Sequence, residues 1–446
     1  MLYPRALTDA DEALVHEAMT VLEENWLGHA TRPSPRLYPH QWSWDSAFIA
    51  IGYSHVDQAR AQQELRSLFR GQWSNGMLPH IVFTTGAANY FPGPEFWQTQ
   101  RCPYAPREPR TSGIVQPPIH ASAALEIYRN AAEPAMAVSF LEELLPRLSS
   151  WHTYLRRERV RRDDGLIEIW HPWESGMDNS PIWDQAMARL VPRAVRDYVR
   201  ADLAQAQQTE RPTDDDYDRY VSLVELFRDC SYLPERIRAT TPFAVADVLY
   251  NSLWVQANAD LAEICRLTGA DPEPFERWRR EASEAMQAKL WNDEHACYVD
   301  YDLVADSPVV TRIGPGFSPL FAGVPTEEQA ARMVEGLTDS VGVSLDTSTW
   351  MVPSFDPRHP GFLPTNYWRG PIWINVNWVL FHGLLRYGYN DLASTLRRSL
   401  IEVPRRSGFY EHYDPQTGGG HGADRFAWTA ALVLDLLFEG AVPATA

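Results

Sequence analysis

Apolar residues recur at helical spacing along most of the chain, and this periodicity limits the possible folds more than any other feature. Helices are predicted at residues 9–26, 44–54, 57–70, 119–131, 134–158, 214–229, 243–268, 272–291, 326–337, 368–387, 390–402 and 427–439. Strand patterns are few and short, at residues 77–83, 166–170 and 297–303. A doubly wound sheet needs strands that alternate with helices, so the chain is predicted to be all-α. About a dozen helices would form six pairs, arranged as an inner and an outer ring.

Two local signals support this assignment. Thr8 followed by Asp11 is typical of a capping box at a helix start. Gly269 and Pro272 combine a glycine that ends one helix with a proline that opens the next. Residues 1–446 are expected to form a single catalytic domain. The segment 184–240, rich in Arg and Asp, is expected to be a helical insertion within it that acts as a lid.

Charge and composition exclude several classes of protein. A net charge of −18 argues against nucleic-acid binding, which needs a basic surface. No apolar run approaches the ~20 residues of a membrane span, and the first residues lack the apolar core of a signal peptide. The four cysteines form no CxxC pair, which indicates free thiols in a reducing cytoplasm. The only lysine, Lys289, is predicted at a helix end, so Schiff-base and phosphate-loop chemistry are not expected.

Several loops combine aromatic residues, prolines and carboxylates, whereas surface loops are usually polar. An indole covers the apolar face of a sugar ring, and a carboxylate accepts hydrogen bonds from its hydroxyls. The segment LYPHQWSWDSAF supplies Tyr38, Trp42, Trp44 and Asp45 for this purpose. Trp44 and Phe48, four residues apart, would instead pack in the core if this segment were only structural. The GGGHG stretch at 418–422 is expected to be a simple loop.

Hydrolysis of a glycoside needs one protonated and one ionised carboxyl group across the scissile bond. In HPWESGMDNSPIWD, residues 171–184, Asp178 is the candidate acid. Met177, Trp173 and Trp183 would remove water from it and Glu174 would repel its charge, both of which raise a carboxyl pKa. The alternative is that Asp178 only shapes a turn and that Glu174 is the acid.

The second carboxyl group is expected from GFYEHYDPQTGGG, residues 408–420. Glu411 is flanked there by Tyr410, His412 and Tyr413, which are predicted to orient the carboxylate and a water molecule. Asp414 competes for this role, although an Asp-Pro step is more typical of a turn.

The loops WSWDSAF, QPP at 116–118, HPWESGMDNSP, NYWRGPIW at 366–373 and FYEHYDPQTG, followed by FAWTAA, resemble the signature loops of glycoside hydrolase family 63 over nearly the whole chain. This resemblance implies an (α/α)6 barrel and an inverting mechanism, with Asp178 as general acid and Glu411 as general base. The chain is more similar still to the family's short bacterial members, which hydrolyse glucosylglycerate and mannosylglycerate. Residues 210–220 resemble their lid segment.

The resemblance also implies binding residues. In the lid segment, Arg211 and Tyr217 match residues that contact the glycerate, and arginine suits a carboxylate because its planar fork binds both oxygens. Phe426 departs from a glutamine that helps to hold glycerate in the glucosylglycerate enzymes. The full predicted substrate-binding set is Tyr38, Trp42, Trp44, Asp45, Tyr90, Gln116, Gly176, Arg211, Tyr217, Tyr367 and Trp368.

The sequence therefore predicts a cytoplasmic, inverting α-glycosidase that releases a hexose from 2-O-α-glucosylglycerate or its mannosyl analogue. No metal or cofactor is expected, and homo-oligomers are allowed. One alternative is a trehalase-like or oligosaccharide α-glucosidase of the same fold. Others are a non-catalytic sugar-binding protein and a helical-barrel epimerase, for which the candidate acid–base residues are His40, His120, His171 and His412.

Overall fold

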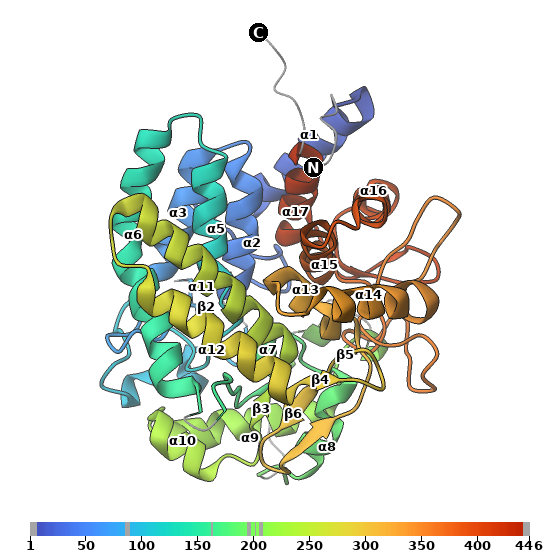
Figure 1. The fold of residues 1–446 in the computed structure, drawn as a ribbon. Coiled ribbons are helices and arrows are strands. Elements are labelled where there is room, and N and C mark those ends of the chain that lie inside the picture. Colours follow the sequence, from blue (N-terminus) through green and yellow to red (C-terminus); the bar gives the residue numbers. More distant parts are fainter. Residues whose placement is uncertain are drawn as a thin grey trace.

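The computed structural model describes residues 7–84, 90–161, 164–193, 198–200, 202–204 and 208–439. Six helices pack side by side in a closed inner ring, in which each contacts the next and the last contacts the first. In ring order they are α2 (Ser43–Ser54), α5 (His120–Arg129), α11 (Val248–Thr268), α13 (Pro319–Ala322), α15 (Ile374–Arg386) and α17 (Ala427–Phe438). This ring is the core of an (α/α)6 barrel (Figure 1).

A second set of helices surrounds the ring. α1 (Asp9–Asn25) packs on α17, α3 (Gln58–Phe69) on α2, α6 (Pro134–Tyr154) on α5 and α11, α12 (Glu273–Lys289) on α11, and α16 (Asn390–Ser407) on α15 and α17. α14 (Glu327–Gly336) is joined to α12 by hydrogen bonds between the side-chain amides of Gln287 and Gln329. The six outer helices complete the double ring that the sequence predicts.

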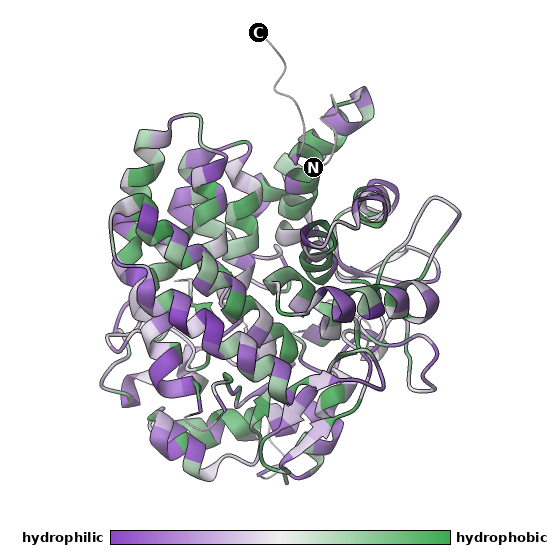
Figure 2. Cartoon of the chain, viewed as in Figure 1, coloured by the Kyte–Doolittle hydropathy of each residue, from purple (hydrophilic) through white to green (hydrophobic). Residues whose placement is uncertain are grey.

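Burial explains which helices lie inside. All twelve residues of α2 are buried, as are the residues of α17 from Ala427 to Leu437. The outer α12 buries only Phe275, Ala282 and Met286. A helix that is apolar on all sides belongs in a core, whereas one with a single apolar stripe covers it. Figure 2 shows the same contrast, with α17 mainly hydrophobic and α12 mainly hydrophilic.

The strands are short and lie in the loops. β1 (Gln41–Trp42) pairs with β2 (Ile81–Val82), β4 (Trp291–Asn292) with β5 (Cys297–Tyr298), and β8 (Tyr410–Tyr413) with β9 (Gly420–Asp424), all antiparallel. β3 (Val245–Ala246), β6 (Asp300–Asp302) and β7 (Ser307–Val309) form a three-stranded sheet in that order. The predicted strand at 166–170 makes only isolated bridges, at Ile167 and Ile169.

Helix boundaries differ from prediction where loops contain helix-compatible residues. The predicted helix 368–387 begins at Ile374, because residues 366–373 form a turn that faces the cavity described below. The predicted helix 243–268 begins at Val248, since the preceding residues form β3 and Asp247 caps the helix. α16 runs past its predicted end at 402 to Ser407, through Pro404. The Thr8 capping box and the left-handed Gly269 cap are both present.

The segment 184–240 contains α8 (Asp184–Ala188), α9 (Asp214–Asp229) and α10 (Pro234–Thr240). Residues 194–197, 201 and 205–207 of this segment lie outside the described residues. Two further short helices, α4 (Pro94–Trp97) and α7 (Pro172–Ser175), lie in the loops. Within the described part of the chain, no helix is both long and apolar enough to cross a lipid bilayer.

Candidate active site

A cavity of about 100 Å³ lies where the inner helices begin. Trp42, which precedes α2, Trp373, which precedes α15, and Phe426, which precedes α17, all line it. Helix N-termini carry partial positive charge, which favours carboxylates nearby. The cavity is several times larger than the ~10–15 Å³ that one water molecule needs, as binding of a small ligand requires.

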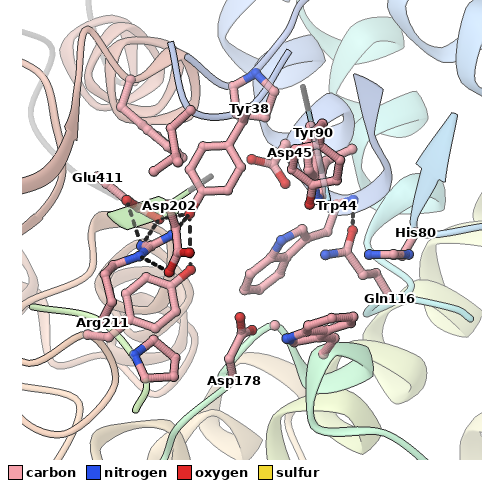
Figure 3. A pocket seen from close by; sticks show the side chains of 18 of the residues that line it. Tyr38, Trp44, Asp45, His80, Tyr90, Gln116, Asp178, Asp202, Arg211 and Glu411 are labelled. Atoms are coloured by element: carbon pink, nitrogen blue, oxygen red, sulfur yellow. Dashed lines mark hydrogen bonds and ion pairs between the residues drawn. The ribbon is translucent and has the colours of Figure 1, made fainter. Parts of the chain in front are cut away.

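The structure brings most of the predicted site residues together around this cavity (Figure 3). Those that line it are Tyr38, Trp42, Trp44, Asp45, Tyr90, Gln116, Gly176, Asp178, Arg211, Tyr217, Tyr367 and Glu411. Trp368 is not among the lining residues. It stacks flat on Trp373 at 3.8 Å between ring centroids, and Trp373 lines the cavity instead.

Asp178 reaches the cavity from the loop that follows α7. Gly176 ends α7 in a left-handed conformation, with φ +74, and a Cβ there would lie 2.4 Å from the Trp44 ring. Only glycine therefore allows this loop to pack against Trp44. Burial raises the pKa of Asp178 to about 7, a value that includes an opposing effect of the Arg211 charge and a smaller additional rise from the Glu411 charge. Asp178 can thus hold a proton near neutral pH.

Glu174 has a different role from either predicted one. Its two carboxylate oxygens accept hydrogen bonds from Arg159 at 2.6 and 2.8 Å, and one of them also accepts the Trp170 backbone N–H at 2.7 Å. The side chain is fully buried and does not line the cavity. The prediction that Glu174 repels the charge of Asp178 is wrong, because Arg159 neutralises it. The alternative that Glu174 is the acid fails for the same reason.

Glu411 enters from the opposite side of the cavity, on β8 (Figure 3). Its carboxylate accepts hydrogen bonds from the Tyr38 hydroxyl at 2.7 Å and from the Ala423 backbone N–H at 3.0 Å. Arg211 lies 3.4 Å from the same group. The predicted support from the neighbours of Glu411 is wrong for His412 and Tyr413. The ring nitrogens of His412 have no hydrogen-bond partner among the described residues, and the Tyr413 hydroxyl donates to the Gly408 carbonyl.

The GGGHG stretch is more than a loop, because it forms most of β9 beside Glu411. Gly422 has φ +70, and a Cβ there would lie 2.5 Å from Glu411 Oε2. Glycine is needed both for this backbone conformation and for the space that Glu411 occupies. Asp414 is confirmed as a turn residue, since its carboxylate accepts the Gln416 backbone N–H at 2.7 Å.

Arg211 joins the segment 184–240 to Glu411. Its guanidinium donates to the Tyr38 hydroxyl at 2.7 Å, lies over the Tyr367 ring at 4.3 Å and is 3.4 Å from Asp202. Asp202 is a lining residue that sequence reasoning missed, because a single Asp in an Arg- and Asp-rich segment has no distinctive pattern. Arg200 forms a 2.7 Å ion pair with Asp202. Positive and negative side chains therefore alternate along the series Arg200, Asp202, Arg211 and Glu411.

Aromatic rings and Asp45 form the rest of the wall. Trp42 packs edge-on against Tyr38 and Tyr90, with ring centroids 5.2 and 5.4 Å apart. Trp44 both lines the cavity and packs on Phe48, so the structural and the sugar-binding interpretations of this segment are compatible. Burial raises the pKa of Asp45 well above its usual range, with Glu411 and Glu64 adding to the effect.

The other predicted residues differ in how they reach the cavity. The Gln116 side-chain oxygen accepts the Trp44 backbone N–H at 3.2 Å. The Tyr217 hydroxyl donates to the Phe91 carbonyl at 3.1 Å. Tyr367 adopts φ +42, a conformation that is uncommon outside glycine and that directs its ring toward Tyr38. Trp173, which was predicted to cover Asp178, also lines the cavity. Lining residues that the sequence prediction missed include His80, Phe91, Trp373, Trp428 and Asp202.

None of the four histidines considered for an epimerase is among the described residues that line the cavity. Burial lowers the pKa of His40 and His171 to about 4 and that of His120 to about 3. His171 instead accepts the Trp173 backbone N–H at the start of α7. The geometry therefore places the two predicted carboxyl groups at the cavity, and none of the four imidazoles proposed for an epimerase.

Two carboxyl groups that line one aromatic cavity are what the hydrolysis of a glycosidic bond requires. The family model described as "Mannosylglycerate hydrolase MGH1-like glycoside hydrolase domain" matches residues 38–429. The chain belongs to this glycoside hydrolase family.

The chain is 48% identical to a mannosylglycerate hydrolase of Rubrobacter radiotolerans, over 96% of this chain and 98% of that one. It is 37% identical to a glucosylglycerate hydrolase of Mycolicibacterium hassiacum, over 95% and 97% of the two chains. The crystal structure of a family 63 mannosylglycerate hydrolase from Thermus thermophilus, in complex with Tris and D-glycerate, superimposes with a TM-score of 0.89 at 41% identity. The match covers 95% of this chain and 99% of that one.

Proposed function

We propose that this protein hydrolyses the glycosidic bond of a small acidic α-glycoside with inversion of configuration, and that Asp178 is the general acid and Glu411 the general base. The observation that carries the proposal is that these two carboxyl groups, 233 positions apart in the sequence, line one aromatic cavity. An inverting enzyme needs a water molecule between its two carboxyl groups, so we expect a separation of roughly 6.5–9.5 Å.

In the proposed reaction, Asp178 donates its proton to the bridging oxygen as the bond to the anomeric carbon breaks. A pKa of about 7 keeps a large fraction of Asp178 protonated at neutral pH. Glu411 removes a proton from a water molecule, whose oxygen attacks the anomeric carbon from the other face of the ring. Hydrogen bonds from Tyr38 and Ala423 fix the Glu411 carboxylate for this step.

The sugar is proposed to bind against Trp42, Trp44 and Asp45, where rings offer apolar faces and the carboxyl group a hydrogen-bond partner. Arg211 is proposed to bind the carboxylate of the leaving group, with Tyr217 beside it. In the structure Arg211 contacts Asp202 and Glu411, so a substrate carboxylate would replace one acidic partner with another.

Mannosylglycerate is the first substrate to test, because the relative of that name shares more identity with this chain than the relative named for glucosylglycerate. Phe426 also lines the cavity. It replaces a glutamine that helps to hold glycerate in the glucosylglycerate enzymes, so it bears on the leaving group and not on the choice between the two sugars. Glycerate bound in the Thermus structure supports an acidic leaving group. A single catalytic domain over residues 1–446, a lid formed by residues 184–240 and a cytoplasmic location remain part of the proposal.

The test is hydrolysis of mannosylglycerate, glucosylglycerate, trehalose and kojibiose under identical conditions. The proposal expects kcat/KM to be highest for a glycerate glycoside. Preference for trehalose or kojibiose would contradict the acidic leaving group but leave glycoside hydrolysis intact. No hydrolysis of any of the four by folded protein would favour a sugar-binding protein.

A further inference from the structure

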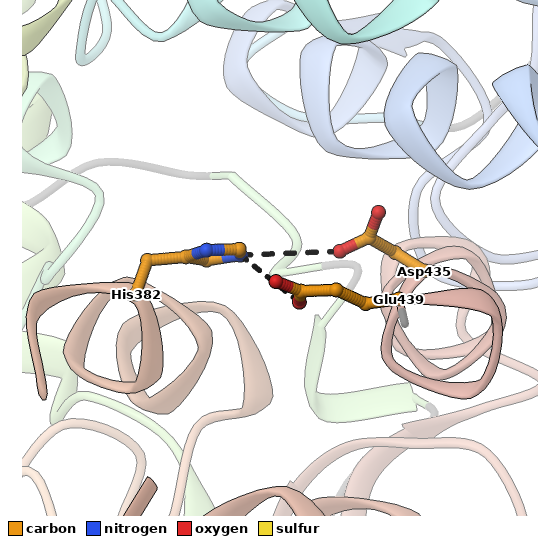
Figure 4. A group of neighbouring side chains, drawn as sticks. All are labelled: His382, Asp435 and Glu439. Atoms are coloured by element: carbon orange, nitrogen blue, oxygen red, sulfur yellow. Dashed lines mark ion pairs between the residues drawn. The ribbon is translucent and has the colours of Figure 1, made fainter. Parts of the chain in front are cut away.

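Three side chains of metal-binding type converge at the far end of the barrel from the cavity (Figure 4). His382 comes from α15, while Asp435 and Glu439 lie four residues apart on one side of α17 and at its C-terminal cap. Their ligand atoms all lie within 4.8 Å of one another. α17 starts at the cavity with Trp428 and ends at this group, which corresponds to a distance of roughly 16 Å along the helix.

The spacing of the three groups leaves two polar atoms without hydrogen bonds. His382 Nε2 is 4.0 Å from Asp435 Oδ2 and 3.9 Å from Glu439 Oε2, which is too long for a hydrogen bond. Neither His382 Nε2 nor Glu439 Oε2 is accessible to solvent, and neither has a hydrogen-bond partner in the described part of the chain. Buried polar atoms are normally satisfied by protein groups, water or an ion, so these two atoms leave room for a bound group between the three side chains.

The local charge also favours a cation. Asp435 in the last turn of α17 and Glu439 at its end lie where the helix dipole is negative. The carboxylate of Glu126, from the neighbouring α5, acts on both of them. Arg397 donates hydrogen bonds to the α17 carbonyls of Leu436 and Glu439, and its charge also acts favourably on the Glu439 carboxylate. A cation between the three side chains would further reduce the repulsion among the carboxylates at this end of the helix.

Asp435 is held in place as the ligands of metal ions usually are. His55 lies 2.8 Å from its Oδ1, and Trp378 donates to its Oδ2 at 2.7 Å. Partners of this kind fix the orientation of a carboxylate before an ion binds. Zinc lies about 2.0–2.2 Å from nitrogen and oxygen ligands, so inward movement of ~0.5 Å by flexible side chains would complete the contacts.

We propose that His382, Asp435 and Glu439 bind one divalent transition-metal ion, for which Zn²⁺ is the best fit, and that this ion links α15 to the end of α17. One imidazole nitrogen and two carboxylate oxygens suit a metal of intermediate softness better than Mg²⁺. Three protein ligands leave a position for water. An open position is typical of catalytic zinc sites, but this site lies at the opposite end of α17 from the carboxyl groups assigned to hydrolysis, so the role proposed for the ion is to join the two helices.

The experiment uses full-length protein without a histidine tag, treated with chelator and then titrated with ZnCl₂ by calorimetry, with MgCl₂ in parallel. We expect one Zn²⁺ per chain, little Mg²⁺ binding, and a thermal midpoint that rises by a few degrees with zinc, since an ion that binds only the folded state stabilises it. The double variant His382→Asn/Glu439→Gln should lose this binding and keep its hydrolytic activity.

The matched control is His359→Asn/Glu402→Gln, which removes the same residue types from outside the group and should bind zinc as the wild type does. Zinc binding that is equal in both double variants would overturn the proposal. So would the absence of binding by wild-type protein, with a water molecule or a proton on Glu439 then filling the gap. If the double variant fails to fold, anomalous diffraction from zinc-soaked wild-type crystals decides, since a peak anywhere but among these three residues contradicts the site.

Discussion

The two walls of the cavity are built in different ways. On the barrel side, Trp42, Trp44 and Asp45 are buried in or beside α2 and are fixed by core packing. On the side of segment 184–240, Arg211 and Asp202 are fixed mainly by ion pairs. Rings held by a core suit a neutral sugar, whereas a charged group held by replaceable partners suits a charged leaving group. Substitutions in the two walls should therefore alter catalysis and substrate choice separately.

The largest effect is expected from Asp178→Asn, which removes the acid from the barrel side. Loss of a general acid typically lowers kcat by about 10²–10⁴-fold, and substrate affinity should change little. Steady-state kinetics with mannosylglycerate measure both. Asp184→Asn is the control, because Asp184 begins α8 only six residues after Asp178 but pairs with Arg369 outside the cavity. An Asp178→Asn variant with the kcat of the wild type would rule out Asp178 as the general acid.

Gly422→Ala should have the next largest effect. The added Cβ would lie 2.5 Å from Glu411 Oε2, and displacing a base by about 1 Å can lower the rate ~10²-fold. Gly388→Ala is a matched control, since Gly388 has φ +79 and a Cβ added there would meet nothing within 4 Å. Both variants bear similar backbone strain, so an equal loss of kcat in both would show that strain, not contact with Glu411, is responsible.

Arg211→Ala tests the other wall. Charge-assisted hydrogen bonds contribute about 1.5–3 kcal/mol each, so KM for a glycerate glycoside should rise by roughly 10–100-fold. Hydrolysis of an uncharged aryl glycoside should be affected less. Arg193→Ala in the same segment is the control, because it pairs with Asp229 at the surface. If kcat/KM falls by the same factor for the glycerate glycoside and for the aryl glycoside, Arg211 acts on Glu411 and not on the leaving group.

The pH dependence is expected to be the smallest effect near neutrality. Since burial raises the pKa of Asp178 to about 7, the active, protonated form predominates below that pH and decreases above it. We expect kcat/KM to fall about tenfold for each unit of pH well above this pKa. Measurement across the neutral range and into mild alkali with folded protein checks this. A profile that stays flat well into the alkaline range would contradict Asp178 as the proton donor.

Periodicity alone predicted most of the long helices, because helices that pack in a double ring must carry apolar stripes. α9 matches its predicted range of 214–229, and α1 differs by one residue. Local sequence fails where distant contacts decide the outcome. Glu174 lies four residues from Asp178, yet its burial against Arg159 could not be inferred from that spacing.

The candidate site shows the same division. Trp42, Trp44 and Asp45 were found because indoles beside a carboxylate form an unusual pattern, and the resemblance to the family added Tyr90, Gln116 and Tyr367. Asp202 and His80 belong to ordinary segments and reach the cavity only through folding. Gly422 was missed because the need for glycine comes from Glu411, eleven residues away. The sequence could not show which of Trp368 and Trp373 lines the cavity, since both belong to one turn. In the folded protein the two rings stack, and Trp373 is the one on the cavity side.

The anomeric form of the sugar first released decides whether the two carboxyl groups have the roles assigned to them. It can be followed by proton NMR during hydrolysis of an α-linked glycerate glycoside. If Asp178 protonates the leaving oxygen while Glu411 activates water on the opposite face, the β-hexose appears first and then mutarotates. Initial release of the α-hexose would mean retention of configuration, and would contradict Glu411 as the general base, since the second carboxylate of a retaining enzyme is a nucleophile.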